Sequence, residues 1–411
     1  MTHEYLSTDV VIVGGGPAGS AAAIELCRSG RSVLLIDKAT FPRDKCCGDG
    51  LTTLALRELE RLEFDPGEVG DWFDVHGAVL RSPSGRQITV PLPDDGRYAA
   101  VAPRLQLDDA LLRLARSHGA DVRDGHGFRA LDTSRSDSHD HVRVEADGLT
   151  IDTRYVIAAD GMWSPVRKAT GANDPGYLGE WHGFRQYASN VTGPAASELH
   201  VWFEPDLVPG YAWSFPLPGN RANIGFGVLR DGTRTGKEIK AIWPDLLQRP
   251  HIVEALGAGF TMEDRHTAWP IPARVDQLPL TAGRVLFVGD AAAATDVMTG
   301  EGIGQALLTG RVAAEAIIAA GATRPDAAAA LYAQEVHHHL VADHKMSLAL
   351  GKVLAKEWGA RGAIRVVEAS GTWGRRNFAR WMFEDEPRAI ALTPSRWHRR
   401  FLKQPGAYRS A

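Results

Sequence analysis

A glycine-rich stretch near the start of this 411-residue sequence has the spacing that dinucleotide chemistry needs. Gly14, Gly16 and Gly19 form a G-x-G-x-x-G pattern, with Pro17 and Ala18 inside it. Glycines at these positions allow a tight turn, let the backbone approach a pyrophosphate, and let a helix pack closely on a strand. The phosphates then lie at the positive end of that helix. The pattern therefore predicts a dinucleotide-binding turn.

An acidic residue supports this interpretation. Asp37 ends the next apolar run, close to the position where a carboxylate receives a ribose hydroxyl. A carboxylate here disfavours a 2′-phosphate, so FAD or NAD is expected in preference to NADP. Lys38 follows Asp37 directly and is included among the candidate cofactor ligands.

Two later turns could hold other parts of a cofactor. Asp160-Gly161 follows the apolar run 155–159, and Gly289-Asp290 follows the run 284–288. An Asp at a strand end can bind a hydroxyl group, although each turn could also be an ordinary strand-to-helix connection. The second turn is followed by a glycine-rich helix start, whose N–H groups suit a carbonyl oxygen or developing negative charge. Its candidate residues are Gly300, Gly302 and Ile303.

Strand and helix signals around these turns predict an α/β fold. Runs 9–13 and 32–37 resemble buried parallel strands, and the intervening segment 17–29 is helical, which makes a βαβ unit. Alternating runs predict hairpins over 75–92 and 142–152, a strand over 155–159, and several antiparallel strands between 181 and 228. Helices are expected over 104–117 and 301–320.

The order of these signals predicts a discontinuous arrangement of domains. Segments 1–74, 100–172 and 280–322 would form the cofactor-binding domain. Segments 75–99 and 173–279 would form a β-rich substrate domain, and 323–411 a C-terminal helical region. We find no internal repeat.

Composition excludes several classes of protein. With 46 Lys and Arg against 50 Asp and Glu, the net charge of −4 does not fit a globally basic nucleic-acid binder. The odd number of cysteines (Cys27, Cys46 and Cys47) favours a reducing compartment over a disulfide framework. A secretory n-region and a long apolar run are not evident, so a cytoplasmic location is expected.

A histidine-rich stretch invites a metal interpretation. His337, His338, His339, Asp343 and His344 share one segment, but they do not form an open-site pattern such as H-E-x-x-H. A solvated polar helix is the preferred interpretation, and no metal is predicted.

The cofactor motifs together with Arg104 at a helix start resemble the FAD-dependent oxidoreductases of the para-hydroxybenzoate hydroxylase fold. Segment 41–52 resembles the P-R-x-K-x-C-G-x-G stretch of the geranylgeranyl reductase family, and 209–216 resembles its Y-x-W-x-F-P strand. Two features depart from related patterns. The loop 296–299 lacks a proline common in the family, and 210–216 does not match the G-W-x-W-x-I-P segment of related halogenases.

The resemblance implies a Rossmann-like FAD-binding domain of the glutathione reductase/para-hydroxybenzoate hydroxylase type, with an inserted antiparallel sheet. FAD would place its adenosine on the first turn and Asp37, and Arg104, Asp160 and Asp290 would hold the rest. Gly48 and the 302–303 pair would lie near the isoalloxazine. NAD(P)H would reduce FAD, which would then reduce a carbon–carbon double bond of an isoprenoid or prenylated substrate. The alternative is an FAD-dependent monooxygenase acting on an isoprenoid or aromatic natural product.

Reduction of an isolated double bond needs a positioned acid. Cys47 and Tyr211 are the candidates, and Cys47 is equally well explained as a packing residue under the flavin. Tyr211 and Trp213 alternate with Phe215 on an expected strand, so they share one face. They could face the flavin, line an apolar tunnel, or pack in the core.

The C-terminal end is aromatic and basic. It could rest on an anionic membrane, although a packed helix with a solvated basic face is the preferred interpretation. Its aromatic residues are Trp358, Trp373, Trp381 and Trp397, and its basic residues are Arg388, Arg396, His398, Arg399, Arg400, Lys403 and Arg409.

Overall fold

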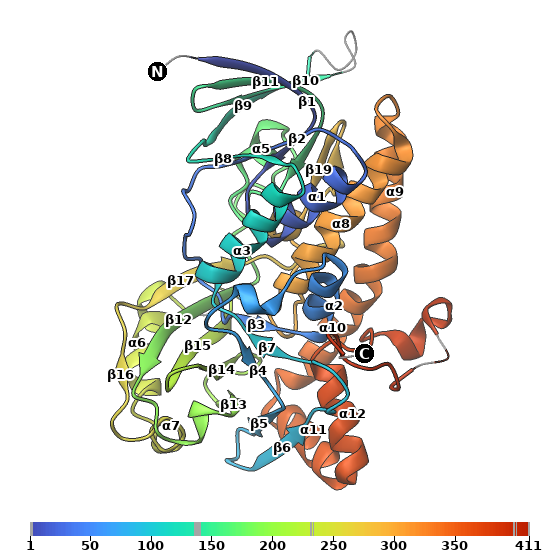
Figure 1. Ribbon diagram of the computed structural model, residues 1–411. Coiled ribbons are helices and arrows are strands. Elements are labelled where there is room, and N and C mark those ends of the chain that lie inside the picture. Colours follow the sequence, from blue (N-terminus) through green and yellow to red (C-terminus); the bar gives the residue numbers. More distant parts are fainter. Residues whose placement is uncertain are drawn as a thin grey trace.

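The computed structural model describes residues 3–134, 141–230, 232, 234–397, 399 and 401–409. This part of the chain forms two eight-stranded sheets and a smaller three-stranded one. In Figure 1 the first large sheet lies at the top, the second lies below it, and the C-terminal helices run down one side to cover the second sheet.

The first sheet is the predicted parallel core. Its main path is β18-β19-β11-β1-β2-β8, and β1 pairs in parallel with both β2 and β11. These strands are Thr281–Ala282, Val285–Phe287, Leu149–Ala158, Glu4–Val13, Val33–Asp37 and Asp121–Asp124, in that order. β9 (Phe128–Asp132) and β10 (Val142–Ala146) extend the sheet through β11.

Helices cover this sheet where the periodicity predicts them. α1 spans Pro17–Arg28 and α3 spans Arg104–Ser117, which confirms both predictions to within a residue. The predicted hairpin over 142–152 is confirmed, since β10 pairs antiparallel with β11 across a turn at residues 147–148, but the prediction of a separate strand at 155–159 is wrong. β11 runs unbroken because its whole length pairs with β1, while Asp152 and Arg154 are less buried than the residues beside them.

The second sheet has the order β16-β12-β15-β14-β13-β5-β6, with β17 beside β12. In that order the strands are Thr261–Met262, Trp181–Ser189, Arg221–Leu229, Tyr211–Leu217, Leu199–Trp202, Gly77–Arg81, Gln87–Pro91 and Thr267–Ile271. Strands from 77–91 thus join those from 181–271. Buried side chains of α6 (Gly236–Leu246) and α7 (Pro250–Leu256) pack in one apolar cluster with this sheet. Those of α11 (Glu357–Ala369) and α12 (Gly371–Met382) pack in another.

Short elements connect the two halves. The small sheet contains β3 (Gly50–Leu51), β7 (Ala100–Val101) and β4 (Phe73–Asp74), and α2 (Thr53–Arg61) follows β3. α5 (Pro165–Ala169) follows β11. Short 3-10 turns occupy Pro66–Glu68, Pro194–Ala196, Gly289–Ala292, Ile390–Leu392 and Pro394–Arg396.

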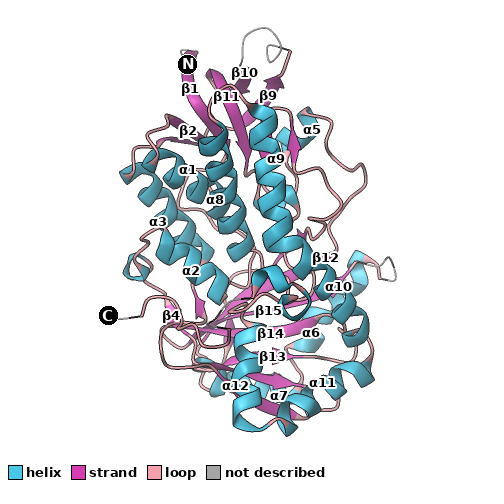
Figure 2. Ribbon diagram, turned by 90° about the vertical axis from the view of Figure 1, so that its right-hand side faces the viewer, coloured by secondary structure: helices cyan, strands magenta, loops and turns pink. Residues whose placement is uncertain are grey.

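The long helix α8 (Ile303–Ala320) is a core element. Among the described residues it is the one helix long and apolar enough to cross a membrane, but 83% of it is buried inside the protein. It packs against α1 and α2, and α9 (Pro325–Val336) lies beside it (Figure 2). Burial against other helices explains its apolar composition without a bilayer.

The C-terminal region is tied to both halves. A π-helical turn (His337–Val341) joins α9 to α10 (Ala342–Leu354), and the chain after α12 folds back on the body. Asp385 accepts from Arg57 of α2 and from Arg380, each at 2.5 Å. Ala407 exchanges backbone hydrogen bonds with Arg97 at 2.8 and 2.9 Å. The region is therefore an integral part of the fold.

Candidate active site

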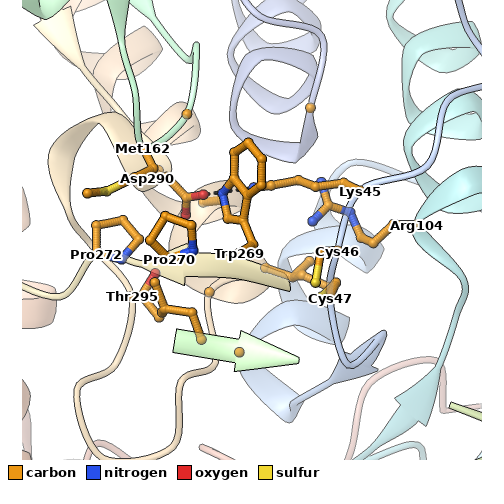
Figure 3. A pocket seen from close by; sticks show the side chains of 18 of the residues that line it. Lys45, Cys46, Cys47, Arg104, Met162, Trp269, Pro270, Pro272, Asp290 and Thr295 are labelled. Carbon is orange, nitrogen blue, oxygen red and sulfur yellow. Dashed lines mark hydrogen bonds and ion pairs between the residues drawn. The ribbon is translucent and has the colours of Figure 1, made fainter. Parts of the chain in front are cut away.

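One large cavity, of about 1190 Å³, lies between the two sheets. Its lining includes the ends of β1, β2, β11 and β19 on one side and β12, β14 and β17 on the other. Figure 3 shows Lys45, Cys46, Cys47 and Arg104 toward the right of the view and Met162, Asp290 and Thr295 toward the left, with Lys45 reaching Asp290.

The structure brings nearly all the predicted site residues to this cavity. Those that line it are Gly14, Gly16, Pro17, Ala18, Asp37, Lys38, Cys47, Gly48, Arg104, Asp160, Gly161, Tyr211, Trp213, Gly289, Asp290, Gly300, Gly302 and Ile303. Gly19 does not line it. A Cβ at Gly19 would lie 1.9 Å from the carbonyl oxygen of Gly14, so this glycine serves the close packing of α1 on the turn.

The first turn leaves backbone open to the cavity. Gly14 has φ +110°, and a Cβ there would lie 2.2 Å from the carbonyl oxygen of Ala159, so a side chain is excluded. The atoms nearest to a Cβ at Gly16 would be guanidinium nitrogens of Arg43 and Arg104, at 3.6 and 3.8 Å. The start of α1, whose first N–H groups have no intrahelical acceptors, is thus exposed to an anion between two arginines.

Carboxylates stand at the ends of two strands of the first sheet. Asp37 accepts from the N–H groups of Gly15 at 2.7 Å and Ala39 at 2.8 Å, which fixes its orientation. Asp160 accepts from the Val166 N–H at 3.0 Å through Oδ2, while its Oδ1 is buried with no partner among the described residues. Burial raises the pKa of Asp160 to about 6. Such an orphaned acceptor suits a ligand hydroxyl.

Ion pairs organise the centre of this side. Arg104 binds Asp108 through two bonds of 2.6 and 2.7 Å, and Arg43 reaches the same carboxylate at 2.6 Å. Burial would raise the pKa of Asp108, but the two guanidinium groups hold it below its usual value. Lys45 pairs with Asp290 at 2.7 Å, and its charge outweighs burial and lowers the pKa of Asp290.

An aromatic wall faces the segment 47–50. A Cβ at Gly48 would lie 3.2 Å from Phe215 and 3.5 Å from Trp213, so this backbone packs directly on the rings of β14. Trp213 donates to Asn223 at 3.1 Å. Tyr211 donates its hydroxyl hydrogen to the carbonyl oxygen of Thr299. The predicted face of alternating aromatic residues therefore lies against the cavity.

Cys47 is held through both its backbone carbonyl group and its side chain. Its carbonyl oxygen accepts from Arg185 at 3.2 Å and Asn223 at 2.9 Å, and its Sγ accepts from the Asp49 N–H at 3.3 Å. Burial raises the pKa of the thiol to about 11, so it remains protonated at neutral pH. The geometry is compatible with both the proton-donor and the packing interpretation.

Comparison with known sequences decides the family. A model described as FAD binding domain matches residues 7–341, which is most of the chain. The chain belongs to this family of FAD-dependent oxidoreductases. A menaquinone reductase of Mycobacterium tuberculosis is 36% identical to this flavoprotein over 332 residues, covering 75% of the chain and 76% of the relative. A digeranylgeranylglycerophospholipid reductase of Methanopyrus kandleri is 32% identical, covering 76% and 80%.

Solved structures confirm the predicted fold class. A geranylgeranyl bacteriochlorophyll reductase-like protein of Thermoplasma acidophilum superposes on the flavoprotein with a TM-score of 0.78 at 21% identity, covering 96% and 100% of the two chains. The flavin-dependent halogenase CmlS gives a TM-score of 0.69 at 21% identity, covering 92% and 72%. This α/β architecture, with its inserted sheet, is thus shared by flavoproteins of different activities.

The residues of the cavity fit FAD. The open backbone at Gly16, flanked by two arginines, suits the pyrophosphate, and Asp37 suits a ribose. The unpartnered Oδ1 of Asp160 and the Lys45–Asp290 pair can bind hydroxyl or phosphate groups. These residues would therefore hold the diphosphate and ribose parts, and the ring system would lie near the 47–50 segment.

Several residues of the site are not predicted from the sequence. Asp108 lies four residues after Arg104 on the expected helix, so helical spacing could have identified it. Arg43 and Lys45 lie inside the segment on which the family resemblance rests, but that pattern says nothing of their partners. Glu301 lies within the predicted glycine-rich helix start, and its sequence neighbours give no sign of its surroundings.

The expected basic face at the C-terminus is partly wrong. Arg388 is buried and pairs with Asp296 at 3.2 Å, and Arg396 pairs with Asp343 at 2.8 Å. Both are used inside the fold and are not free to meet a membrane. His398 and Arg400 lie outside the described residues, while Arg399, Lys403 and Arg409 are exposed.

Proposed function

We propose that this flavoprotein reduces carbon–carbon double bonds in the isoprenoid part of an apolar substrate, with electrons from NAD(P)H. When bound, FAD would supply the chemistry by accepting a hydride from the nicotinamide and passing it to the substrate. The observation that carries the proposal is the apolar wall of Tyr211, Trp213 and Phe215 against the segment 47–50. Reductases of menaquinone and of a digeranylgeranyl lipid among the relatives support it.

The residues of the chain would divide the work by position. Arg104 and Lys45 bind and orient the charged part of the cofactor. Trp213 and Phe215 exclude water from the ring side of the cavity and present an apolar surface to a prenyl chain. Such a division orients the reactants and keeps the reduced cofactor from solvent.

Product mass tests the proposal. The holoenzyme is mixed anaerobically with NADH or NADPH, and flavin bleaching is followed by absorbance. Menaquinone or a digeranylgeranylglycerophospholipid is then added. We expect a mass gain of two hydrogens for each double bond reduced, which for menaquinone must persist after air reoxidises the quinol ring, because ring reduction also adds two hydrogens. Trp213→Ala should slow this step without preventing bleaching.

A second experiment separates the competing activity. Flavin monooxygenation would use the same cofactor elements but would insert an oxygen atom. Repeating the reaction under labelled O₂ and finding the label in the product would overturn the reductase proposal. Failure of both nicotinamides to bleach the flavin would overturn the assignment of the electron donor.

We also propose that the α11–α12 hairpin contacts an anionic membrane to collect the substrate. Trp358, Val366 and Trp373 have exposed fractions of 65%, 70% and 75%, and Lys356 and Arg365 are exposed nearby. Exposed tryptophans with basic neighbours suit a lipid headgroup region.

Vesicle co-sedimentation tests this contact. The protein should bind phosphatidylglycerol vesicles and be released by salt, and Trp358→Ala/Trp373→Ala should weaken binding. Tyr5→Ala, which removes an exposed ring from the start of β1, is the matched control and should bind as the wild type does. Equal binding by all three proteins would contradict the proposal.

A further inference from the structure

An acidic cluster lies beside the aromatic wall of the cavity. Asp296 and Glu301 come from the loop before α8, Glu384 follows α12, and Arg388 lies four residues further along. Arg388 is buried and contacts Asp296 at 3.2 Å and Glu384 at 3.6 Å. Two carboxylates therefore contact one guanidinium group, and the nearby Glu301 carboxyl group has no ion pair among the described residues. Full ionisation would leave an excess of negative charge in a buried place, so the cluster favours retaining a proton.

Hydrogen-bond donors are distributed unequally over these acids. Asp296 accepts from the N–H groups of Met298 and Thr299 at 3.0 and 2.8 Å and from the Ser347 hydroxyl at 2.8 Å. These donors and Arg388 outweigh burial and lower the pKa of Asp296, which is ionised.

Glu384 is also provided with donors. It accepts from Thr52 and Gln305, each at 2.8 Å. In the described parts of the chain, no hydrogen bond or ion pair reaches the side chain of Glu301. Burial raises the pKa of Glu384 to about 7, so both acids retain a proton more readily than a free carboxyl group, and Glu301, which has no donor among the described residues, is the one that retains it more tightly.

Glu301 faces the site of the proposed reaction. Its side chain lines the cavity, and a Cβ at Gly50 would lie 3.5 Å from its Oε1 and 3.1 Å from Phe215. The carboxyl group thus lies beside the same short segment that packs on the aromatic wall and carries Cys47. A prenyl chain lying along that wall would pass next to it.

We propose that Glu301 is the catalytic acid of the reduction, that Glu384 and Asp296 are positioning residues that keep it protonated between turnovers, and that Arg388 limits the negative charge of the cluster. The proposal rests on the proposed function. One carbon of the double bond receives the hydride from the reduced cofactor, and the other receives the proton from the Glu301 carboxyl group. The π bond breaks, two C–H bonds form, the cofactor is oxidised, and Glu301 is left as a carboxylate.

The cluster can absorb that charge. Nη1 of Arg388 has no partner within the described structure, so a donor is available when Glu301 ionises. Glu301 then regains a proton from water before the next turnover. Arg388 and Glu384 lie beyond the matched region 7–341, so the C-terminal segment, and not only the FAD-binding domain, equips the site.

Acid strength favours Glu301 over the residues predicted from sequence. Burial, followed by the charges of Glu384 and Asp296, raises the pKa of Glu301 to about 8. The Cys47 thiol, with a pKa of about 11, is a weaker acid, and the Tyr211 hydroxyl is engaged with Thr299. An acid works best when its pKa lies near the working pH.

The first experiment reads the proton without substrate. Infrared titration of the holoenzyme should show a carboxylic-acid carbonyl band at pH 7 that Glu301→Gln removes. Glu384→Gln should lower the pKa of Glu301, and Arg388→Gln should raise it. Glu335→Gln, an exposed acid on α9, is the matched control and should leave the band unchanged. An ionised Glu301 at pH 7 would overturn the proposal.

The second experiment follows the reaction in two halves. Glu301→Gln should retain FAD and be bleached by dithionite as the wild type is. Its reoxidation by the digeranylgeranyl lipid, which has no quinone ring to accept the electrons, should be slower by about 10²–10⁴-fold, the usual contribution of a general acid. Glu301→Asp should recover part of this rate. The wild-type rate should fall above about pH 8, and that of Glu384→Gln at lower pH.

The outcomes separate the two proposals. If the wild type reduces a double bond and Glu301→Gln does so equally fast, the catalytic role is overturned while the proposed function stands. If the wild type reduces neither lipid, the proposed function fails and takes the catalytic role with it. The infrared band would still report the shared proton in that case.

Discussion

The two ends of the cavity differ in how fully nearby cations balance their carboxyl groups. At the Arg104 end, Asp108 lies between two arginines and Asp290 is paired with Lys45. At the Glu301 end, Arg388 pairs with both Asp296 and Glu384, and Glu301 has no ion pair within the described structure. The first arrangement fixes the ionisation of every member, and the second leaves one proton free to move.

This difference matches what each end would bind. Fixed cations suit the permanent negative charge of a diphosphate, because a group that titrated there would weaken cofactor binding as the pH changed. A carboxyl group without a cation partner suits a step in which it gives up a proton and later regains one. A single cavity can therefore hold an anion firmly at one end and exchange a proton at the other.

The largest predicted effect comes from removing an ion pair at the Arg104 end, where each carboxylate has a cation partner. Asp108→Asn would leave Arg104 buried without its carboxylate, at a cost of about 3–5 kcal/mol in the free energy of unfolding. Loss of Arg104 orientation should also weaken FAD binding. Urea unfolding followed by circular dichroism, with FAD titration, measures both.

Its neighbour provides the control. Asp109→Asn breaks an exposed pair with Arg113 on the same helix and should change the free energy of unfolding by less than about 1 kcal/mol. Equal effects of the two substitutions would show that Arg104 does not depend on Asp108 and would remove the basis of the comparison.

At the Glu301 end we predict an effect of intermediate size on the free energy of unfolding, and this effect depends on pH. The pKa of Glu301 rises on folding from 4.5 to about 8, so the folded state binds its proton more tightly. Its contribution to stability is complete below about pH 4.5 and is lost as the pH rises towards 8.

The variant Glu301→Gln should lack this dependence. Between pH 5 and 8 the wild type should lose about 3–4 kcal/mol more than the variant, since one pKa unit corresponds to about 1.4 kcal/mol. Urea unfolding at both values measures the difference, with Glu335→Gln as control. Parallel curves for wild type and Glu301→Gln would show that this acid is already ionised.

The same comparison explains what could be predicted from sequence. Glycine spacing and helical periodicity are local, so the first turn and helix 104–117 emerge from short windows, and Asp108 was within reach of an i,i+4 argument. The Glu301 cluster joins residues as far apart as Asp296 and Arg388, which are 92 positions apart. No period or motif links Glu301 to Arg388, because only the return of the chain after α12 brings them together.

Strand continuity was a different failure. The sequence analysis ends the hairpin at residue 152 and begins a new strand at 155, whereas β11 continues through Asp152 and Arg154. Pairing with β1 along the whole length supplies backbone hydrogen bonds that a local pattern cannot anticipate. The polar residues in this stretch correctly indicate which positions of the strand are exposed. They do not indicate where the strand ends, because that is decided by its pairing with β1.

The smallest predicted effect tests the boundary between the two ends. Tyr211→Phe removes one hydrogen bond to the Thr299 carbonyl, which is worth about 1 kcal/mol and would loosen the loop that carries Glu301. We expect a slightly lower melting temperature and FAD affinity reduced by less than about tenfold, with double-bond reduction retained. Tyr5→Phe, at an exposed site, should change neither. If Tyr211→Phe instead bound FAD normally and lost reduction altogether, the proton would come from Tyr211, as the sequence alone suggested, and the acidic cluster would serve only to hold the C-terminal segment in place.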